Sequence, residues 1–153
     1  MLDEEDRDAV VLVVDDDRES RHAVCRMVRG LGYRVAARAG GRQALEYLAS
    51  HPRVVRLLLA DLAMPQMDGG ELLERARDLD PALQASLMVA PGEHAELLGG
   101  YRDVPRLAKP VGFGELYSRL REALGPPPIA ARPTSAGPVR ARPGRRTSGR
   151  HEI

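Results

Sequence analysis

The sequence is poor in residues that mark several common classes of protein. It has one cysteine, Cys25, so it cannot form an internal disulfide, and a reducing compartment is indicated. It has no tryptophan, one phenylalanine and an aromatic share of 3%, which argues against rows of stacking side chains for single-stranded nucleic acid. It also lacks a basic-then-apolar leader and any apolar run long enough to span a bilayer. We therefore expect a cytoplasmic protein with an aliphatic core and no membrane insertion.

Lysine is scarce as well, because Lys109 is the single lysine among 23 basic residues. Six arginines and one glutamate lie from residue 125 onward, which leaves 17 basic and 21 acidic residues before it, or a charge of about −4. The last segment is rich in Pro, Arg, Gly, Ser and Thr and has almost no bulky apolar residues. We therefore divide the chain into a flexible N-terminus (1–8), one folded domain (9–124) and a disordered basic tail (125–153).

Two interpretations of the basic tail stay open. It can attract nucleic acid or acidic partners weakly and in a salt-sensitive way, or it can be a solvated tail without a partner, which we favour. The tail is too short, and has too little helical periodicity, for a dedicated DNA-binding domain of the usual size.

Strand-like and helix-like patterns alternate along residues 9–124. Short apolar runs predict five strands, at Ala9–Val14, Tyr33–Ala37, Val54–Ala60, Ser86–Ala90 and Val104–Ala108. Apolar residues at helical spacing predict five helices, of which Gly92–Leu98 is the weakest, and Leu72, Leu73, Ala76 and Leu79 should share one buried face. Pro105 suits an edge strand, and Gly32 suits the position just after a helix. The alternation predicts an α/β fold, a doubly wound parallel sheet with helices on both faces.

The stretch Leu57–Gly70 gives the first candidate site. An apolar run stopped by Pro65 and by Asp68-Gly69 predicts a buried strand that delivers Asp61 to a loop. Ligands of open α/β sheets bind beyond the carboxyl ends of the strands, so Asp61 is placed like a reactive group. By itself, however, Asp61 can equally be a cap for the next turn.

Charged residues follow three of the predicted strands. Asp15 and Asp16 follow the first strand, Asp61 the third and Lys109 the fifth, and a strand order of 2-1-3-4-5 makes these ends neighbours. Converging carboxylates repel one another, and their natural partner is a hard divalent cation such as Mg²⁺. A lysine beside them supplies a positive charge for a phosphoryl oxygen. The pattern indicates phosphoryl chemistry at a magnesium site, although one of Asp15, Asp16 and Asp17, most simply Asp17, is expected to cap the first helix.

Over roughly Val10–Leu124 the sequence resembles the receiver domain of two-component response regulators, of the single-domain type. The resemblance rests on the following motifs: Val13-Val14-Asp15-Asp16-Asp17, Leu31-Gly32-Tyr33, Asp61 with Met64-Pro65-Gln66-Met67-Asp68-Gly69, and Lys109-Pro110. It implies a flavodoxin-like, five-stranded sheet of order 2-1-3-4-5.

The resemblance also implies a role for each matching residue. Asp61 would accept a phosphoryl group from the phosphohistidine of a sensor histidine kinase or a phosphotransfer protein. Asp16, Asp61 and the backbone carbonyl of Ala63 would bind Mg²⁺, and Asp15 would hold a metal-bound water. Lys109 would contact a phosphoryl oxygen, and the Lys109-Pro110 bond is often cis in this family.

Two positions depart from the family pattern. Ala90 stands where a serine or threonine is usual at the end of the fourth strand, and Arg106 stands where an aromatic residue is usual in the fifth. Either phosphorylation still occurs and switches the output surface weakly or by another route, or the domain is a phosphorylation-independent docking module. The intact set of Asp16, Asp61 and Lys109 favours the first alternative.

Turnover of substrate is not expected. Phosphatases with an aspartate nucleophile place a second aspartate two residues later as general acid, and here that residue is Ala63. We expect phosphate transfer to Asp61 alone, with output through protein–protein contact or as a phosphate sink. The resemblance also allows a homodimer through the surface of the Gly92–Leu98 helix, the fifth strand and the last helix.

Overall fold

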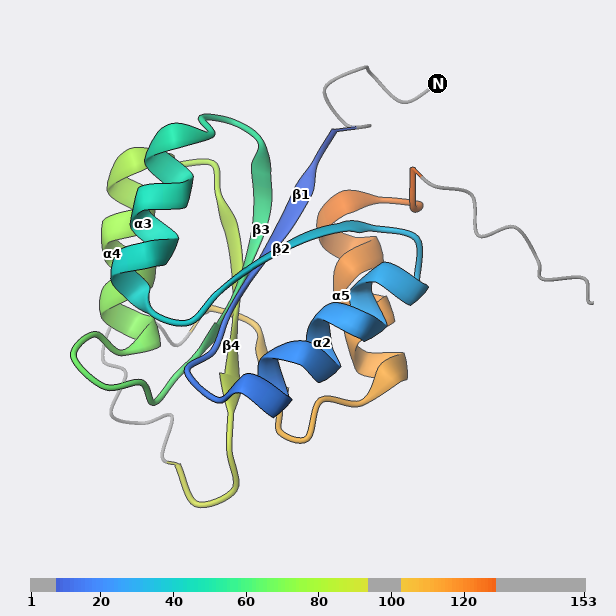
Figure 1. Ribbon diagram of the computed structural model, residues 1–153. Helices are drawn as coiled ribbons and strands as arrows, with labels where there is room; N and C mark the ends of the chain where they lie inside the picture. The colour runs from blue at the N-terminus through green and yellow to red at the C-terminus, as the bar shows by residue number, and fades with distance from the viewer. Residues whose placement is uncertain (1–7, 94–102, 129–153) are drawn as a thin grey trace, which may run out of the picture.

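The computed structural model describes residues 8–93 and 103–128 as one parallel sheet between two layers of helices (Figure 1). The elements in chain order are β1 (Val10–Val14), α2 (Arg18–Gly30), β2 (Arg34–Arg38), α3 (Gly41–Ser50), β3 (Val55–Asp61), α4 (Gly69–Leu79), β4 (Gln84–Val89), β5 (Arg106–Ala108) and α5 (Phe113–Leu124).

The strand order is β2-β1-β3-β4-β5, and every neighbouring pair is parallel. The predicted fold class and strand order are therefore confirmed. β1 and β3 are almost wholly buried in the middle of the sheet, as their unbroken apolar runs predicted. β5 follows Pro105 at one edge, where a residue without an N–H does not interrupt a ladder.

Each face of the sheet carries its own apolar core. α3 and α4 cover one face, where Leu48, Leu72 and Leu73 pack against β1 and β3 residues such as Leu12 and Leu58. α2 and α5 cover the other face, and here the buried side chains include Val24, Val28, Leu116 and Leu120. Because helices cover both faces, the central strands can be approached only from their ends, and the carboxyl end is one of these two.

Local sequence signals fix the ends of the helices. Asp17 caps α2 by accepting a hydrogen bond from the Ser20 backbone N–H at 3.2 Å, as predicted. At the other end of α2, Gly32 and Tyr33 donate their backbone N–H groups to Arg29 and Val28, which is the Schellman arrangement that places Gly32 just after the helix.

The structure corrects some of the predicted boundaries. Ala90 lies beyond β4, in a turn, and not in the strand itself. Leu79, the last residue of α4, is 52% exposed, whereas Leu72, Leu73 and Ala76 are buried as predicted. Gly92 and Glu93 are not helical, and the rest of the predicted Gly92–Leu98 helix lies outside the described residues. So does most of the predicted basic tail, from residue 129 onward.

Candidate functional site: an acidic crevice at the carboxyl edge

Three strands deliver the predicted site residues to one place. Asp15 directly follows β1, Asp61 is the last residue of β3, and Lys109 directly follows β5. The Lys109 ammonium Nζ lies 2.8 Å from Asp15 Oδ2 and 3.0 Å from Asp61 Oδ1. Asp15 and Asp61 are buried, whereas Asp16 is exposed at the rim. Residues separated by up to 94 positions therefore form one acidic crevice with a single ammonium group in contact with two carboxylates.

Asp15 is fixed from several sides. Its Oδ1 accepts a hydrogen bond from the Asp17 backbone N–H at 3.0 Å, and its backbone carbonyl accepts one from the Arg21 guanidinium at 2.7 Å. With Lys109 on the other carboxylate oxygen, both oxygens of Asp15 are engaged. This side chain is therefore held in place before any ligand arrives.

The two buried carboxyl groups differ in acidity. Burial raises the pKa of Asp61 to about 6, and the charges of Asp15 and Glu93 add to this, against the hydrogen bond and charge of Lys109. Burial also acts on Asp15, but hydrogen bonds from Lys109, Ser20 and the Asp17 N–H outweigh it and lower the pKa of Asp15. For Lys109, burial is outweighed by its two carboxylate partners, so its pKa is raised. Lys109 therefore stays charged, and Asp61 loses its proton at a higher pH than an ordinary aspartate does.

The crevice suits a divalent cation. One carboxylate oxygen from each of Asp15, Asp16 and Asp61 lies within 4.8 Å of the others. Carboxylate oxygens are the ligands that Mg²⁺ prefers, and two of the three groups are withdrawn from solvent, where their mutual repulsion is costly without a cation. These residues therefore fit the metal that the sequence predicted.

The loop that follows Asp61 brings Gly69 back against the end of β3, next to the site. Ala63 is exposed two residues beyond Asp61, and Asp68 caps α4 by accepting from the Glu71 backbone N–H at 2.8 Å. Gly69 begins α4 against the end of β3, because its N–H donates to the Leu62 carbonyl at 2.8 Å. A Cβ at Gly69 would lie 2.5 Å from the Asp61 carbonyl oxygen, so only glycine allows this approach.

The two atypical positions lie just after the end of β4 and at the start of β5. Ala90 is half-buried just beyond β4, next to Val89, whose carbonyl accepts from the Lys109 N–H at 2.8 Å. Arg106 is exposed at the start of β5, opposite Leu87 in the ladder. The structure thus brings Ala90 to the crevice and leaves Arg106 outside it.

A family model that describes the response regulator receiver domain matches residues 11–121 of the chain. The chain belongs to this family. The cis peptide bond between Lys109 and Pro110 also agrees with the expectation from the family resemblance.

One curated relative of this receiver domain is matched over nearly its whole length. The response regulator receiver protein CpdR of Brucella abortus is 34% identical over 118 residues, which cover 74% of this chain and 95% of that protein. The transcriptional regulatory protein ZraR of Escherichia coli O157:H7 is 35% identical over 116 residues, but the chain spans only about a quarter (26%) of its length.

Solved structures agree with the fold. A putative response regulator from Chloroflexus aurantiacus is 29% identical with a TM-score of 0.67, and the match covers 75% of this chain and 96% of that one. The chemotaxis protein CheY4 of Vibrio cholerae is 25% identical, also with a TM-score of 0.67, and the match covers 76% and 98% of the two chains.

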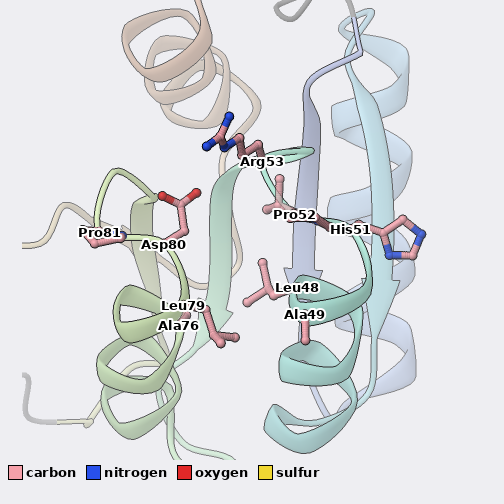
Figure 2. A pocket seen from close by; sticks show the side chains of 10 residues that line it. Leu48, Ala49, His51, Pro52, Arg53, Ala76, Leu79, Asp80 and Pro81 are labelled. Atoms are coloured by element: carbon pink, nitrogen blue, oxygen red, sulfur yellow. The ribbon is translucent and has the colours of Figure 1, made fainter.

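A hollow of about 440 Å³ lies at the opposite edge of the sheet (Figure 2). The ends of α3 and α4 form it, with Leu48, Arg53 and Leu79 among its lining residues. Val55, the first residue of β3, also lines it, whereas Asp61 is the last residue of that strand, so the hollow takes no part in the acidic crevice. Among the described helices, none has both the length and the apolar character needed to cross a membrane.

Two contacts, one beside the site and one beneath α5, were not predicted from the sequence. Glu93 accepts a hydrogen bond from the Ala90 backbone N–H through its side chain, at 3.0 Å. Arg119 of α5 is buried and donates to Ser86 Oγ of β4 at 2.6 Å. The tetrapeptide Ala90-Pro91-Gly92-Glu93 is a recognisable turn signal, so Glu93 had a sequence signature that the predicted helix at Gly92–Leu98 obscured.

Proposed function

We propose that this receiver domain accepts a phosphoryl group on Asp61, in the cytoplasm and with Mg²⁺, from the phosphohistidine of a sensor histidine kinase or a phosphotransfer protein. One observation carries the proposal: Lys109 Nζ contacts both Asp15 and Asp61 in a crevice where three carboxylates meet. An ammonium held between two acidic groups is placed to stay in contact with the acceptor and to meet an incoming phosphoryl oxygen.

In the proposed reaction, an oxygen of Asp61 forms a bond to phosphorus while the bond from phosphorus to the donor imidazole nitrogen breaks. The electron pair stays on that nitrogen, which takes up a proton, and Asp61 becomes an acyl phosphate. Lys109 offsets negative charge on the transferring group, and Asp15 holds Lys109 in place. Catalysis of this kind depends on position and electrostatics more than on covalent chemistry by the protein.

Asp16, Asp61 and the backbone carbonyl of Ala63 would bind Mg²⁺, and Asp15 would hold a water of the ion. A bound Mg²⁺ neutralises charge on the phosphoryl oxygens. The buried position of Asp61 also restricts access of water to the acceptor carboxylate.

The domain would modify itself once per phosphoryl group, and we propose no turnover enzyme. Ala63 has no side-chain acid to assist a phosphatase cycle. Output would occur through contact with another protein, or the domain would drain phosphate from a pathway. The alternative is a phosphorylation-independent docking module, which the atypical Ala90 and Arg106 favour.

A phosphodonor assay separates these two functions. The full chain is incubated with Mg²⁺ and acetyl phosphate, and the mass of the intact protein is measured for wild type, Asp61→Asn and Asp78→Asn. Asp78→Asn makes the same chemical change at an exposed residue of α4. Wild type and Asp78→Asn should gain one phosphoryl group, and Asp61→Asn should gain none. A wild-type protein that neither gains phosphate nor binds a beryllofluoride mimic would be a docking module instead.

A further inference from the structure

One side of α2 carries a stripe of basic residues. They recur at intervals of four, four and three positions, a spacing that places side chains on the same side of a helix. They are Arg18, His22, Arg26 and Arg29, all of them exposed, and together they form the basic flank of α2. Within α2, Glu19 is the single acidic residue. At the rise of an α-helix the basic flank is about 16 Å long.

A hollow of about 320 Å³ lies beside the basic flank, between α2 and the edge strand β2. Its lining residues are His22, Cys25, Arg26, Arg29 and Ala37. These residues include no carboxylate, and no Phe, Tyr or Trp side chain on which a nucleic-acid base would usually stack. The hollow therefore offers guanidinium groups to a ligand and suits an anion that needs no stacking surface.

The arginines of the basic flank differ from exposed arginines of the other helices. On α3, Arg42 Nε lies 3.4 Å from Glu46 Oε1, and on α4, Arg75 Nη2 lies 2.9 Å from Glu71 Oε1. In both pairs the partner is one helical turn away. Within the part of the chain that the structure describes, the three arginines of the basic flank form no such ion pair. Their charge is free to meet a partner.

The basic flank is separate from the acceptor crevice. The other side of α2, with Ser20, Ala23 and Met27, lines a different hollow together with Lys109 and Pro110. No residue of the basic flank lines that hollow. A ligand on the basic flank would therefore leave Lys109 and the crevice accessible.

The edge of β2 beside the hollow is blocked to strand pairing at Ala37. The Arg38 carbonyl accepts from the Asp15 N–H, on the β1 side, at 3.3 Å. Successive residues of a strand direct their backbone groups to opposite sides, so the Ala37 carbonyl points outward. The Arg38 guanidinium donates to this carbonyl at 2.6 Å and covers it. A partner here would be recognised by side chains and not by the addition of a strand.

We propose that the basic flank docks a short acidic segment of a partner protein, with Arg26 and Arg29 bound to its carboxylates. This inference goes beyond phosphate acceptance and does not depend on it. A guanidinium binds a carboxylate through two parallel hydrogen bonds, so these side chains match that partner in geometry as well as in charge. The length of the flank corresponds to about five residues of extended chain.

The charge of the domain favours a short segment over a long polyanion. Residues 1–124 carry a net charge of about −4, so the basic flank is a local exception on a negative domain. Asp15, Asp16 and Asp17 precede the first residue of α2, at the end of the helix where the flank begins. A nucleic acid that ran along the flank and past this end would meet their charges and be repelled, whereas a segment as short as the flank would not reach them.

The test uses hexaglutamate as the probe and compares two double variants. Arg26→Gln with Arg29→Gln removes two charges from the basic flank. Arg42→Gln with Arg75→Gln removes two charges from exposed arginines that already have glutamate partners, and it serves as the control. Each full-length, ¹⁵N-labelled chain is titrated in metal-free buffer of low ionic strength, and amide chemical shifts are followed by NMR. Hexaglutamine and a single-stranded oligonucleotide of equal charge are titrated in parallel.

We expect hexaglutamate to shift the amides of α2 and of Ala37 in wild type, and hexaglutamine to leave them unchanged. The Kd read from these amides should be weaker by about fivefold or more in the flank variant, and within about twofold of wild type in the control variant. Added salt should weaken binding, because ions screen the attraction. Unchanged amides elsewhere in the domain would show that the flank variant is folded.

Three results would overturn the inference. They are shifts confined to residues 129–153, equal effects of the two double variants, and tighter binding of the oligonucleotide than of hexaglutamate to α2. Failure of the proposed function would be seen separately, because a wild-type chain that gains no phosphate from acetyl phosphate could still bind hexaglutamate on the basic flank.

Discussion

Lys109 and Arg119 are largely withdrawn from solvent, and they are neutralised in different ways. The Lys109 side chain is 16% exposed and contacts the carboxylates of Asp15 and Asp61. The Arg119 side chain is 8% exposed, and its close partners are neutral oxygens, Ser86 Oγ at 2.6 Å and the Ala85 carbonyl at 3.1 Å. The acidic group nearest to it, Glu122, is exposed and lies 3.9 Å away.

The difference separates a reactive contact from a structural one. Lys109 has charged partners, so a phosphoryl oxygen can take its place among them without leaving a cation unpaired. Arg119 joins α5 to β4 through neutral oxygens, and burial lowers its pKa by more than the charge of the exposed Glu122 raises it. We therefore expect substitution of Lys109 to affect chemistry and substitution of Arg119 to affect stability.

The largest effect should follow loss of the Lys109 charge. Lys109→Met keeps most of the aliphatic stem, but it leaves Asp15 and Asp61 without their ammonium partner. The rate of phosphate acceptance from acetyl phosphate should fall by roughly 100-fold or more, since removal of one preorganised charge from a transition state has this size. In Arg119→Met the rate should stay within about threefold of wild type. A Lys109→Met protein with the wild-type rate would remove the distinction between the two cations.

Substitution of Arg119 should cost stability. Arg119→Ala opens a cavity under α5 and leaves the Ser86 hydroxyl and the Ala85 carbonyl without their donor, so the free energy of unfolding should fall by about 3 kcal/mol. Urea unfolding measures this, and Arg121→Ala, an exposed arginine of the same helix, is the control and should change it by less than about 0.5 kcal/mol. Equal effects of the two substitutions would show that the buried contacts of Arg119 contribute little.

Neutralising Asp61 should stabilise the metal-free protein. Folding raises the pKa of Asp61 from 3.8 to about 6, so the folded state binds the proton more tightly than the unfolded state. The stability of wild type relative to Asp61→Asn should therefore fall as pH rises from 4 to 6, and above that range Asp61→Asn should be more stable by about 3 kcal/mol.

Urea unfolding in a chelator at several pH values tests this. Mg²⁺ should stabilise wild type more than Asp61→Asn, because it binds the ionised carboxylate of the folded state. A difference in stability that does not depend on pH would contradict the assignment of the raised pKa to Asp61.

The smallest effect concerns the two atypical positions, Ala90 and Arg106. Ala90→Thr with Arg106→Tyr restores the residue types usual in the family at these two positions. If Ala90 and Arg106 limit the switch, phosphorylation should alter hydrogen exchange in α5 of the double variant more than in wild type, by about two- to threefold in rate. The same exchange pattern in both proteins would exclude these positions as the limiting ones.

The sequence predicted the crevice better than its surroundings. Asp15, Asp61 and Lys109 each follow an apolar strand, and parallel strands bring such ends to one edge, so three local patterns were enough to predict a long-range cluster. Arg119 lies three residues after Leu116, on the face of α5 that packs against the sheet. Its partner Ser86 belongs to β4, and the helical periodicity of α5 cannot predict a contact with a residue 33 positions earlier in the chain. Glu93 was missed because weak helical spacing was given more weight than the Pro91-Gly92 turn.

Chemical trapping of the acceptor tests the central claim most directly. After reaction with acetyl phosphate and Mg²⁺, the full chain is treated with borohydride, which reduces an acyl phosphate of aspartate to homoserine, and peptides are mapped by mass. Homoserine at position 61, absent from Asp61→Asn and from samples without Mg²⁺, is the predicted result. Phosphate without homoserine at that position, or homoserine at position 15 or 16 instead, would contradict the account.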